Sequence, residues 1–405
     1  MWGLFVMRKL RFTIAVFLLL LFPVYGVDVT VVKSGAIKSA VDLSGFNCSG
    51  GEAAALFRKT LEDDLIRSGW FTIAGEGRGT ISVLGSCSES GGSLGVECRV
   101  SAVAARDFLH KTFNEQKTMA RRLAHTVADE IVFAVKGRRG IASTRIAMIG
   151  SRNGKKNLYL CDLDGGNLVQ VTREGAICLA PAWCHDGRSL VYTSFHRGFP
   201  DVYMINLATK ERRRIAAYPG LNAGADVSPD GENMALTLSK DGNPELYVIN
   251  LRTDRLTRLT RTRYAAEASP SWSPDGKQIV FVSDKSGSPQ LYVMDRSGRE
   301  ERRITFRGDE NVAPDWGPDG RIAFSSKRQG RYQICFIDVM TRKEMQITIE
   351  YADYEDPSWA PDGRHIVCSR TERYHSDLYV LDTMGDPAIQ LTMMEGDWYF
   401  PAWSK

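Results

Sequence analysis

One sequence unit recurs through the C-terminal part of this 405-residue chain. Each copy contains a tryptophan or an apolar substitute, a Pro-Asp-Gly turn, an alternating strand that ends in serine, a Leu-Tyr-Val strand and a Leu-Thr end. The tryptophan position recurs every 43 to 45 residues, at Trp183, Val227, Trp272, Trp316, Trp359 and Trp403. A period in the low forties with four short strands per unit is typical of a β-propeller blade. The six copies therefore predict a six-bladed β-propeller, which is an all-β fold.

The two ends of the repeat region predict how the ring closes. Residues 401–404, Pro-Ala-Trp-Ser, carry only the innermost strand of a copy, and the other strands of that copy begin at Arg145. We therefore expect the propeller to span residues 145–405, with strand 401–404 completing the first blade. A blade built from both ends of the region leaves no open sheet edge where the ring closes.

Residues 27–140 lack the repeat, and their pattern predicts a smaller α/β domain that precedes the propeller. Apolar residues at four-residue spacing predict two helices, within 50–69 and 117–135. Short apolar runs predict strands at 27–32, 71–74, 80–85 and 96–104. A basic, glycine-bounded linker, 136–140, then leads to the first repeat.

Residues 1–26 have the pattern of a secretory signal peptide. Arg8, Lys9 and Arg11 precede an apolar run, 12–22, and Gly26 is a small residue at a passable cleavage position. The run is short for a membrane span, although an uncleaved anchor is the alternative. Cleavage would lower the formal charge of the chain from +4 to +1. A net charge this close to zero gives no indication of nucleic-acid binding.

The reactive residue types predict neither a catalytic centre, a metal site nor a cofactor. The six histidines occupy unrelated positions and the chain has no Cys-x-x-Cys pair, so no ligand set is indicated. Gly91-Gly-Ser-Leu-Gly95 matches a hydrolase nucleophile pattern, but it lies in a predicted turn, which explains its glycines better. Cys87 and Cys98 flank this turn and either form a disulfide or remain free.

The meander of each blade predicts which loops share a face. Connections from the fourth strand of one blade to the first strand of the next reach the central axis, and several of them are acidic and aromatic. We expect these loops to be exposed, so that single substitutions barely change stability. They form either a partner-binding surface or a solvated charged rim. The candidate residues are Leu221, Asn222, Tyr264, Glu267, Asp309, Glu310, Asn311, Asp353, Tyr354, Glu355, Asp397 and Trp398.

The repeats, the closing Phe400-Pro-Ala-Trp-Ser404, the preceding α/β domain and the leader together resemble the TolB family of the Tol–Pal envelope system. The resemblance covers the whole chain. It implies a non-enzymatic periplasmic adaptor that supports outer-membrane integrity and cell division. A Pal-like lipoprotein would bind over the channel mouth, and a TolA-like inner-membrane protein would bind the mature N-terminal segment. That segment comprises Val27, Asp28, Val29, Thr30, Val31, Val32, Lys33, Ser34 and Gly35.

The same repeat also occurs in enzymes, which leaves a different class of function open. A propeller hydrolase or lyase, or an accessory protein that binds a small ligand or peptide in the channel, is the alternative. A peptidase would need a further hydrolase domain that carries serine, aspartate and histidine. A lyase would need basic or metal-binding residues in the channel, whereas the predicted channel mouth is acidic.

Overall fold

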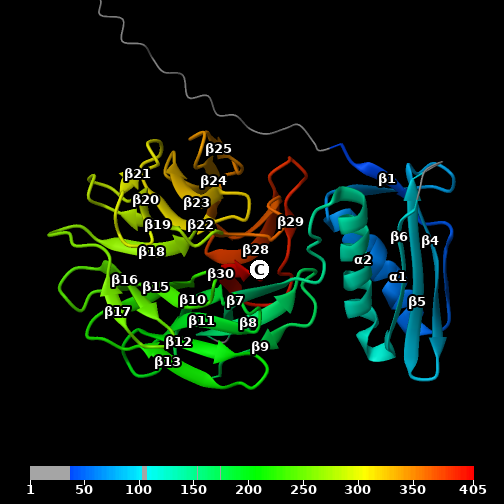
Figure 1. The fold of residues 1–405 in the computed structure, drawn as a ribbon, viewed down its shortest axis with the longest axis horizontal. Helices are drawn as coiled ribbons and strands as arrows, with labels where there is room; N and C mark the ends of the chain where they lie inside the picture. Colours follow the sequence, from blue (N-terminus) through cyan, green and yellow to red (C-terminus); the bar gives the residue numbers. More distant parts are fainter. Residues whose placement is uncertain (1–36, 103–106, 153, 174) are drawn as a thin grey trace, which may run out of the picture.

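The computed structural model describes residues 37–102, 107–152, 154–173 and 175–405, which form a six-bladed β-propeller and a smaller α/β domain beside it (Figure 1). The leader, the predicted strand 27–32 and the candidate N-terminal segment 27–35 lie outside the described residues. Among the helices of the described part, none is long and apolar enough to cross a membrane.

The α/β domain packs two helices against one face of a mixed sheet. Apolar side chains of the helices, such as Phe57, Leu61 and Ile131, are buried against this face because they recur at helical spacing. The strand order is β3-β1-β4-β5-β6, and β2 also pairs with β4. The elements are β1 (Ser39–Asp42), β2 (Phe46–Ser49), α1 (Glu52–Arg67), β3 (Phe71–Ala74), β4 (Ile81–Ser90), β5 (Ser93–Ala102), β6 (Asp107–Gln116), η1 (Lys117–Met119) and α2 (Ala120–Lys136).

Both helices occur where the sequence predicts them, and β3 has the predicted bounds. Strands β1, β2 and β6 are absent from the sequence-based prediction. The sequence analysis left open whether Cys87 and Cys98 form a disulfide, and the strand register does not favour this pair. Cys87 lies opposite Val96, and Cys98 lies opposite Gly85, so the two cysteines are not cross-strand partners. Both are free thiols.

The propeller consists of six four-stranded antiparallel sheets. Three blades are β30-β7-β8-β9 (Asp397–Trp403, Arg145–Arg152, Lys155–Asp162, Val169–Gln170), β10-β11-β12-β13 (Cys178–Trp183, Ser189–Ser194, Asp201–Asn206, Arg212–Ala216) and β14-β15-β16-β17 (Asn222–Val227, Asn233–Leu238, Glu245–Asn250, Leu256–Arg258). The others are β18-β19-β20-β21 (Glu267–Trp272, Gln278–Ser283, Gln290–Asp295, Arg302–Arg303), β22-β23-β24-β25 (Asn311–Trp316, Arg321–Arg328, Arg331–Asp338, Glu344–Gln346) and β26-β27-β28-β29 (Asp353–Trp359, His365–Glu372, His375–Asp382, Ile389–Gln390).

The first blade closes the ring with the last strand of the chain, as the repeat pattern predicts. Strand β30 pairs antiparallel with β7, and Trp403 lies opposite Ile146. The strand begins at Asp397, earlier than predicted, because the loop residues before Pro401 also join the ladder. The indole Nε1 of Trp403 donates a hydrogen bond to Thr144 Oγ1 at 2.8 Å.

The threonine that ends most copies has a structural role. In five blades its hydroxyl oxygen accepts a hydrogen bond from a backbone N–H of the third strand, at 2.9 to 3.0 Å. The fourth strand is only two or three residues long in these blades, so the hydroxyl satisfies an amide at the point where the ladder ends. The residues are Thr172, Thr260, Thr305, Thr348 and Thr392.

Each innermost strand has a β-bulge three residues before the tryptophan position. The bulged residue has a positive φ of 45° to 57° in all six strands, although only one of the six is glycine. A bulge bends a strand and increases its twist. Repetition of the bulge around the axis shapes the wall of the central channel. The bulged residues are Ala180, Gly224, Ser269, Ala313, Asp356 and Phe400.

Candidate functional site

Connections between blades share one face of the propeller with the connections from the second to the third strand of each blade. Backbone hydrogen bonds join the two sets, for example from Lys327 N–H to Glu310 O at 2.8 Å and from Ser239 N–H to Leu221 O at 3.1 Å. The Pro-Asp-Gly turns lie at the opposite ends of the same strands. We call the first surface the loop face and the second the turn face.

Four successive inter-blade connections each carry a large exposed apolar side chain, and that of Met393 also lines a cavity with Arg67 of α1 and Leu163 of the turn after β8. Tyr264, Tyr351 and Met393 are each 83% exposed, and Phe306 is 68% exposed. We call these four residues the apolar rim. Arginine guanidinium groups lie over three of its rings, at 5.1 Å for Tyr264 and Phe306 and at 4.5 Å for Tyr351. Exposed aromatic side chains beside arginine are typical of protein-binding surfaces.

The predicted carboxylates of the loop face have basic partners from neighbouring connections. Glu310 forms an ion pair with Lys327 at 2.7 Å, and Asp353 forms one with Arg331 at 2.7 Å. The hydrogen bond from Lys327 is the main cause that lowers the pKa of Glu310. The sequence analysis treated acidic and basic loops as separate features, whereas the fold brings them together. The candidate surface is therefore a set of fixed ion pairs around apolar side chains rather than a purely acidic ring.

Asp397 also has a partner, because His375 lies 2.8 Å from its carboxylate. Among the twelve candidates, Tyr264 and Asp309 are exposed, and Leu221, Glu310, Asp353, Glu355 and Asp397 are half-buried. Burial, followed by the charge of Asp353, raises the pKa of Glu355. These seven residues lie on or beside the inter-blade connections of the loop face, where the repeat pattern places them.

Five candidates are buried, which corrects the expectation that all twelve lie in exposed loops: Asn222, Glu267, Asn311, Tyr354 and Trp398. All five are the fifth residue before the tryptophan position, where the chain turns into the innermost strand. The side-chain amide of Asn222, for instance, donates hydrogen bonds to the carbonyl oxygens of Pro200, Tyr218 and Gly220. These side chains hold the inter-blade connections in place, so their substitution would reduce stability.

The sequence analysis missed Phe306, Tyr351 and Met393, although one signal was available. Phe306 and Met393 directly follow the threonine that ends their copies, and Ile349 follows Thr348 in the same way. Ile349 is 60% exposed. A position just beyond the end of a ladder faces solvent, so repeated apolar residues there indicate a binding surface.

The innermost strands enclose a channel cavity of about 200 Å³, which Asp226, Asp315, Asp356 and Lys405 help to line. Burial raises the pKa of Asp356 to about 7 and that of Asp315 to about 6. Lys405 places its Nζ 3.9 Å from Asp226 and contributes a positive charge among these carboxylates. The cavity is smaller than a typical ligand pocket of roughly 300–1,000 Å³.

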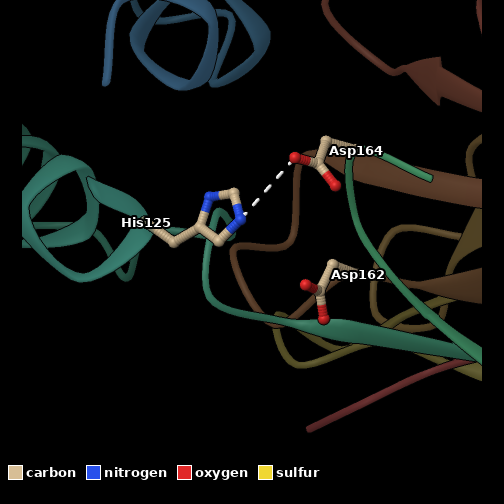
Figure 2. A group of neighbouring side chains, drawn as sticks. All are labelled: His125, Asp162 and Asp164. Atoms are coloured by element: carbon tan, nitrogen blue, oxygen red, sulfur yellow. Dashed lines mark ion pairs between the residues drawn. The ribbon is translucent and has the colours of Figure 1, made fainter. Parts of the chain in front are cut away.

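A buried charged cluster joins the α/β domain to the turn face (Figure 2). The Nδ1 of His125 on α2 lies 2.6 Å from the carboxylate of Asp64 on α1. Its Nε2 lies 3.6 Å from Asp164, in the turn after β8. The possible metal-ligating atoms of His125, Asp162 and Asp164 lie within 4.8 Å of one another. The guanidinium of Arg121 already forms an ion pair with Asp164, which makes this cluster an interdomain ion-pair network.

The protonation of His125 follows from these neighbours. Burial alone would lower its pKa, but the hydrogen bond to Asp64 and the charges of Asp64, Asp164 and Asp162 outweigh burial and raise it. A second interdomain contact lies nearby. The guanidinium of Arg364 stacks over Trp70 at 4.4 Å and forms an ion pair with Asp382 at 2.6 Å. The α/β domain is therefore anchored to the turn face and leaves the loop face open.

This architecture defines a class of protein: a six-bladed propeller that carries a small α/β domain on one face and a loop-built candidate binding surface on the other. A family model described as the TolB beta propeller domain matches residues 133–405. The chain belongs to this family.

Curated relatives match parts of the chain. The chain is 30% identical over 226 residues to the Tol-Pal system protein TolB of Legionella pneumophila (strain Corby), which covers 50% of this chain and 54% of the relative. It is 34% identical over 141 residues to the Tol-Pal system protein TolB of Desulfosudis oleivorans, which covers 35% and 32%. The chain thus spans about half or less of the length of these curated relatives.

A solved structure matches more of the chain. The crystal structure of TolB from Acinetobacter baumannii superposes with a TM-score of 0.81 at 27% identity, and the match covers 92% of this chain and 98% of that chain. The α/β domain, which the family model does not reach, is therefore part of a shared two-domain architecture.

Proposed function

We propose that the protein is a non-enzymatic adaptor of the Tol–Pal system in the periplasm, and that its loop face binds a Pal-like lipoprotein. The observation that carries the proposal is the apolar rim, with one exposed large side chain on each of four successive inter-blade connections. The names of the relatives support the system to which we assign it. Such an adaptor would support outer-membrane integrity and cell division.

The physical chemistry of the loop face suits a protein partner. Exposed tyrosine and phenylalanine supply large contact areas with few rotatable bonds, so they lose little entropy on binding. The ion pairs Glu310–Lys327 and Asp353–Arg331 hold charged groups in fixed positions around these rings. Fixed charges of both signs favour one docking orientation of the partner over others. The channel cavity of about 200 Å³ gives no specific support to the alternative of a hydrolase, lyase or ligand-binding accessory protein.

A second partner would bind elsewhere. We assign a TolA-like inner-membrane protein to the segment from Val27 to Gly35, on the basis of the family resemblance. The segment and the loop face are separate parts of the sequence, so the two partner assignments can be tested independently.

Calorimetric titration of a Pal-like lipoprotein domain tests the loop face. Tyr351→Ala and Tyr264→Ala should each raise the Kd at least fivefold, which corresponds to more than about 1 kcal/mol. Met340→Ala is the matched control, because Met340 is 91% exposed but lies in the turn between β24 and β25 on the turn face. All three variants should melt within a few degrees of the wild type. Unchanged affinity in both tyrosine variants would show that the rim is not the lipoprotein site.

Deletion of residues 27–35 separates the two partner assignments. The deletion should abolish binding of a TolA-like domain in the same assay and leave the Kd for the lipoprotein within about twofold. A deletion that leaves TolA-like binding intact would contradict the segment assignment without affecting the loop-face proposal.

A further inference from the structure

Two cysteines of the α/β domain are direct partners on neighbouring strands. Strands β2 and β4 are parallel, and their register places Cys48 opposite Cys87. Neighbouring strands lie about 4.8 Å apart, and residues in register point to the same face of the sheet. Disulfides join Cα atoms that are about 4.4–6.8 Å apart. The backbone therefore already provides the separation that a disulfide needs.

The side chains of this pair meet at the edge of the domain core. Cys87 is buried in the core, and Cys48 is partly buried and packs against the same core. Because the two residues are in register on one face of the sheet, their thiols are direct neighbours. Cys48 is therefore partly accessible to a thiol reagent, whereas Cys87 is buried.

The surroundings give the two thiols different reactivities. The hydrogen bond from Cys87 is the main cause that lowers the pKa of Cys48, and the positive charge of Arg58 adds to it. The same hydrogen bond, together with burial, raises the pKa of Cys87. Cys48 is thus the thiolate that attacks an oxidant, and Cys87 is the thiol that completes the exchange.

We propose that Cys48 and Cys87 form an intrachain disulfide by exchange with an external disulfide, and that this bond links β2 to β4. The Cys48 thiolate attacks one sulfur of the oxidant, which forms a mixed disulfide and releases the first oxidant thiolate. Cys87 then loses its proton and attacks the sulfur of Cys48, which releases the second. The two cysteines give two electrons to the oxidant, and their two protons convert its thiolates to thiols.

The bond has a structural consequence for the domain. Strand β2 leads directly into α1, and α1 carries Asp64, which holds His125 in the interdomain cluster. A covalent link between β2 and β4 fixes the start of α1 and closes a loop of roughly 40 residues, which restricts the unfolded chain. Oxidation should therefore raise the melting temperature of the α/β domain by several degrees.

Peptide mapping of the full chain tests the bond directly. The purified protein is incubated with oxidised glutathione, alkylated in denaturant with iodoacetamide and digested without reduction. The expected result is a peptide that joins Cys48 to Cys87, with the other six cysteines alkylated. Alkylated Cys48, Cys48 carrying glutathione, or a peptide that joins Cys87 to Cys98 would each overturn the proposal.

Calorimetric melting with and without reductant gives a second readout. The oxidised wild type should melt higher than the reduced form, and Cys48→Ser should abolish this difference. Cys98→Ala is the matched control, because it removes a neighbouring buried thiol of the same sheet and should keep the difference. A redox-dependent shift that persists in Cys48→Ser would refute the assignment of the bond to this pair.

Discussion

Replacement of Trp403 by alanine should destabilise the whole propeller, because this residue closes the ring. Trp403 is 1% exposed and packs in a core cluster that includes Ile146 and Met148 of β7. Its indole N–H also donates to Thr144 Oγ1, just before β7 begins. One side chain therefore joins the last strand of the chain to the first strand of the repeat region.

The magnitude follows from two losses. Truncation of a buried tryptophan to alanine costs about 3–5 kcal/mol through lost burial and the remaining cavity. Loss of the hydrogen bond adds about 0.5–1.5 kcal/mol. Thr144 is within hydrogen-bonding distance of the Ile141 carbonyl and so retains a partner. We expect the free energy of unfolding of the propeller to fall by about 4–6 kcal/mol, and its Tm to fall by roughly 10 °C or more.

Urea unfolding followed by circular dichroism measures this loss, and scanning calorimetry measures the Tm. Trp403→Phe keeps most of the ring and removes the N–H, so its double-mutant cycle with Thr144→Val isolates the hydrogen bond. Tyr374→Ala removes a ring that is 99% exposed and should change stability by less than about 0.5 kcal/mol. A loss below 1 kcal/mol in Trp403→Ala would refute the argument that β30 holds the ring closed.

Three other substitutions test the remaining structural arguments. The pKa of His125 is raised in the folded protein, so its protonated ring stabilises the fold. This contribution is complete below about pH 6.5, the pKa of histidine in the unfolded chain, and is lost as the pH rises through the folded pKa. The urea midpoint of the wild type should therefore exceed that of His125→Gln by more at pH 6 than at pH 9, and an equal gap would contradict the ion-pair assignment. Thr305→Val leaves a buried N–H of β20 without its acceptor and should cost about 1–3 kcal/mol in urea unfolding, whereas Thr257→Val on an exposed position should cost almost nothing. Asp356 has a pKa raised to about 7, so the wild type loses stability as pH rises from 4 to 7. Asp356→Asn, which also tolerates the positive φ, should raise the Tm more at pH 8 than at pH 4; the reverse order would contradict the channel assignment.

The candidate site was only partly predictable from sequence. The repeat placed the inter-blade connections on one face, because loop positions follow from strand order alone. It did not distinguish Tyr351, which is exposed, from Tyr354, which is buried three residues later. Both are tyrosines in one polar loop, and their difference depends on where that loop bends into the innermost strand. Whether a loop side chain is buried depends on how the neighbouring blade packs against it as well as on the loop itself.

The features that could be predicted from the sequence are those that depend on short-range, periodic interactions. Six turn-and-strand copies of nearly constant length specify six blades, and the lone Trp403 copy specifies the closure, because turn geometry and strand alternation act within a few residues. Only the tertiary structure decided which distant groups meet. The pairs Cys48 with Cys87, Asp64 with His125 and Asp353 with Arg331 join separate strands, helices or loops. No periodic pattern encodes such contacts, because they depend on sheet register and on how whole elements dock.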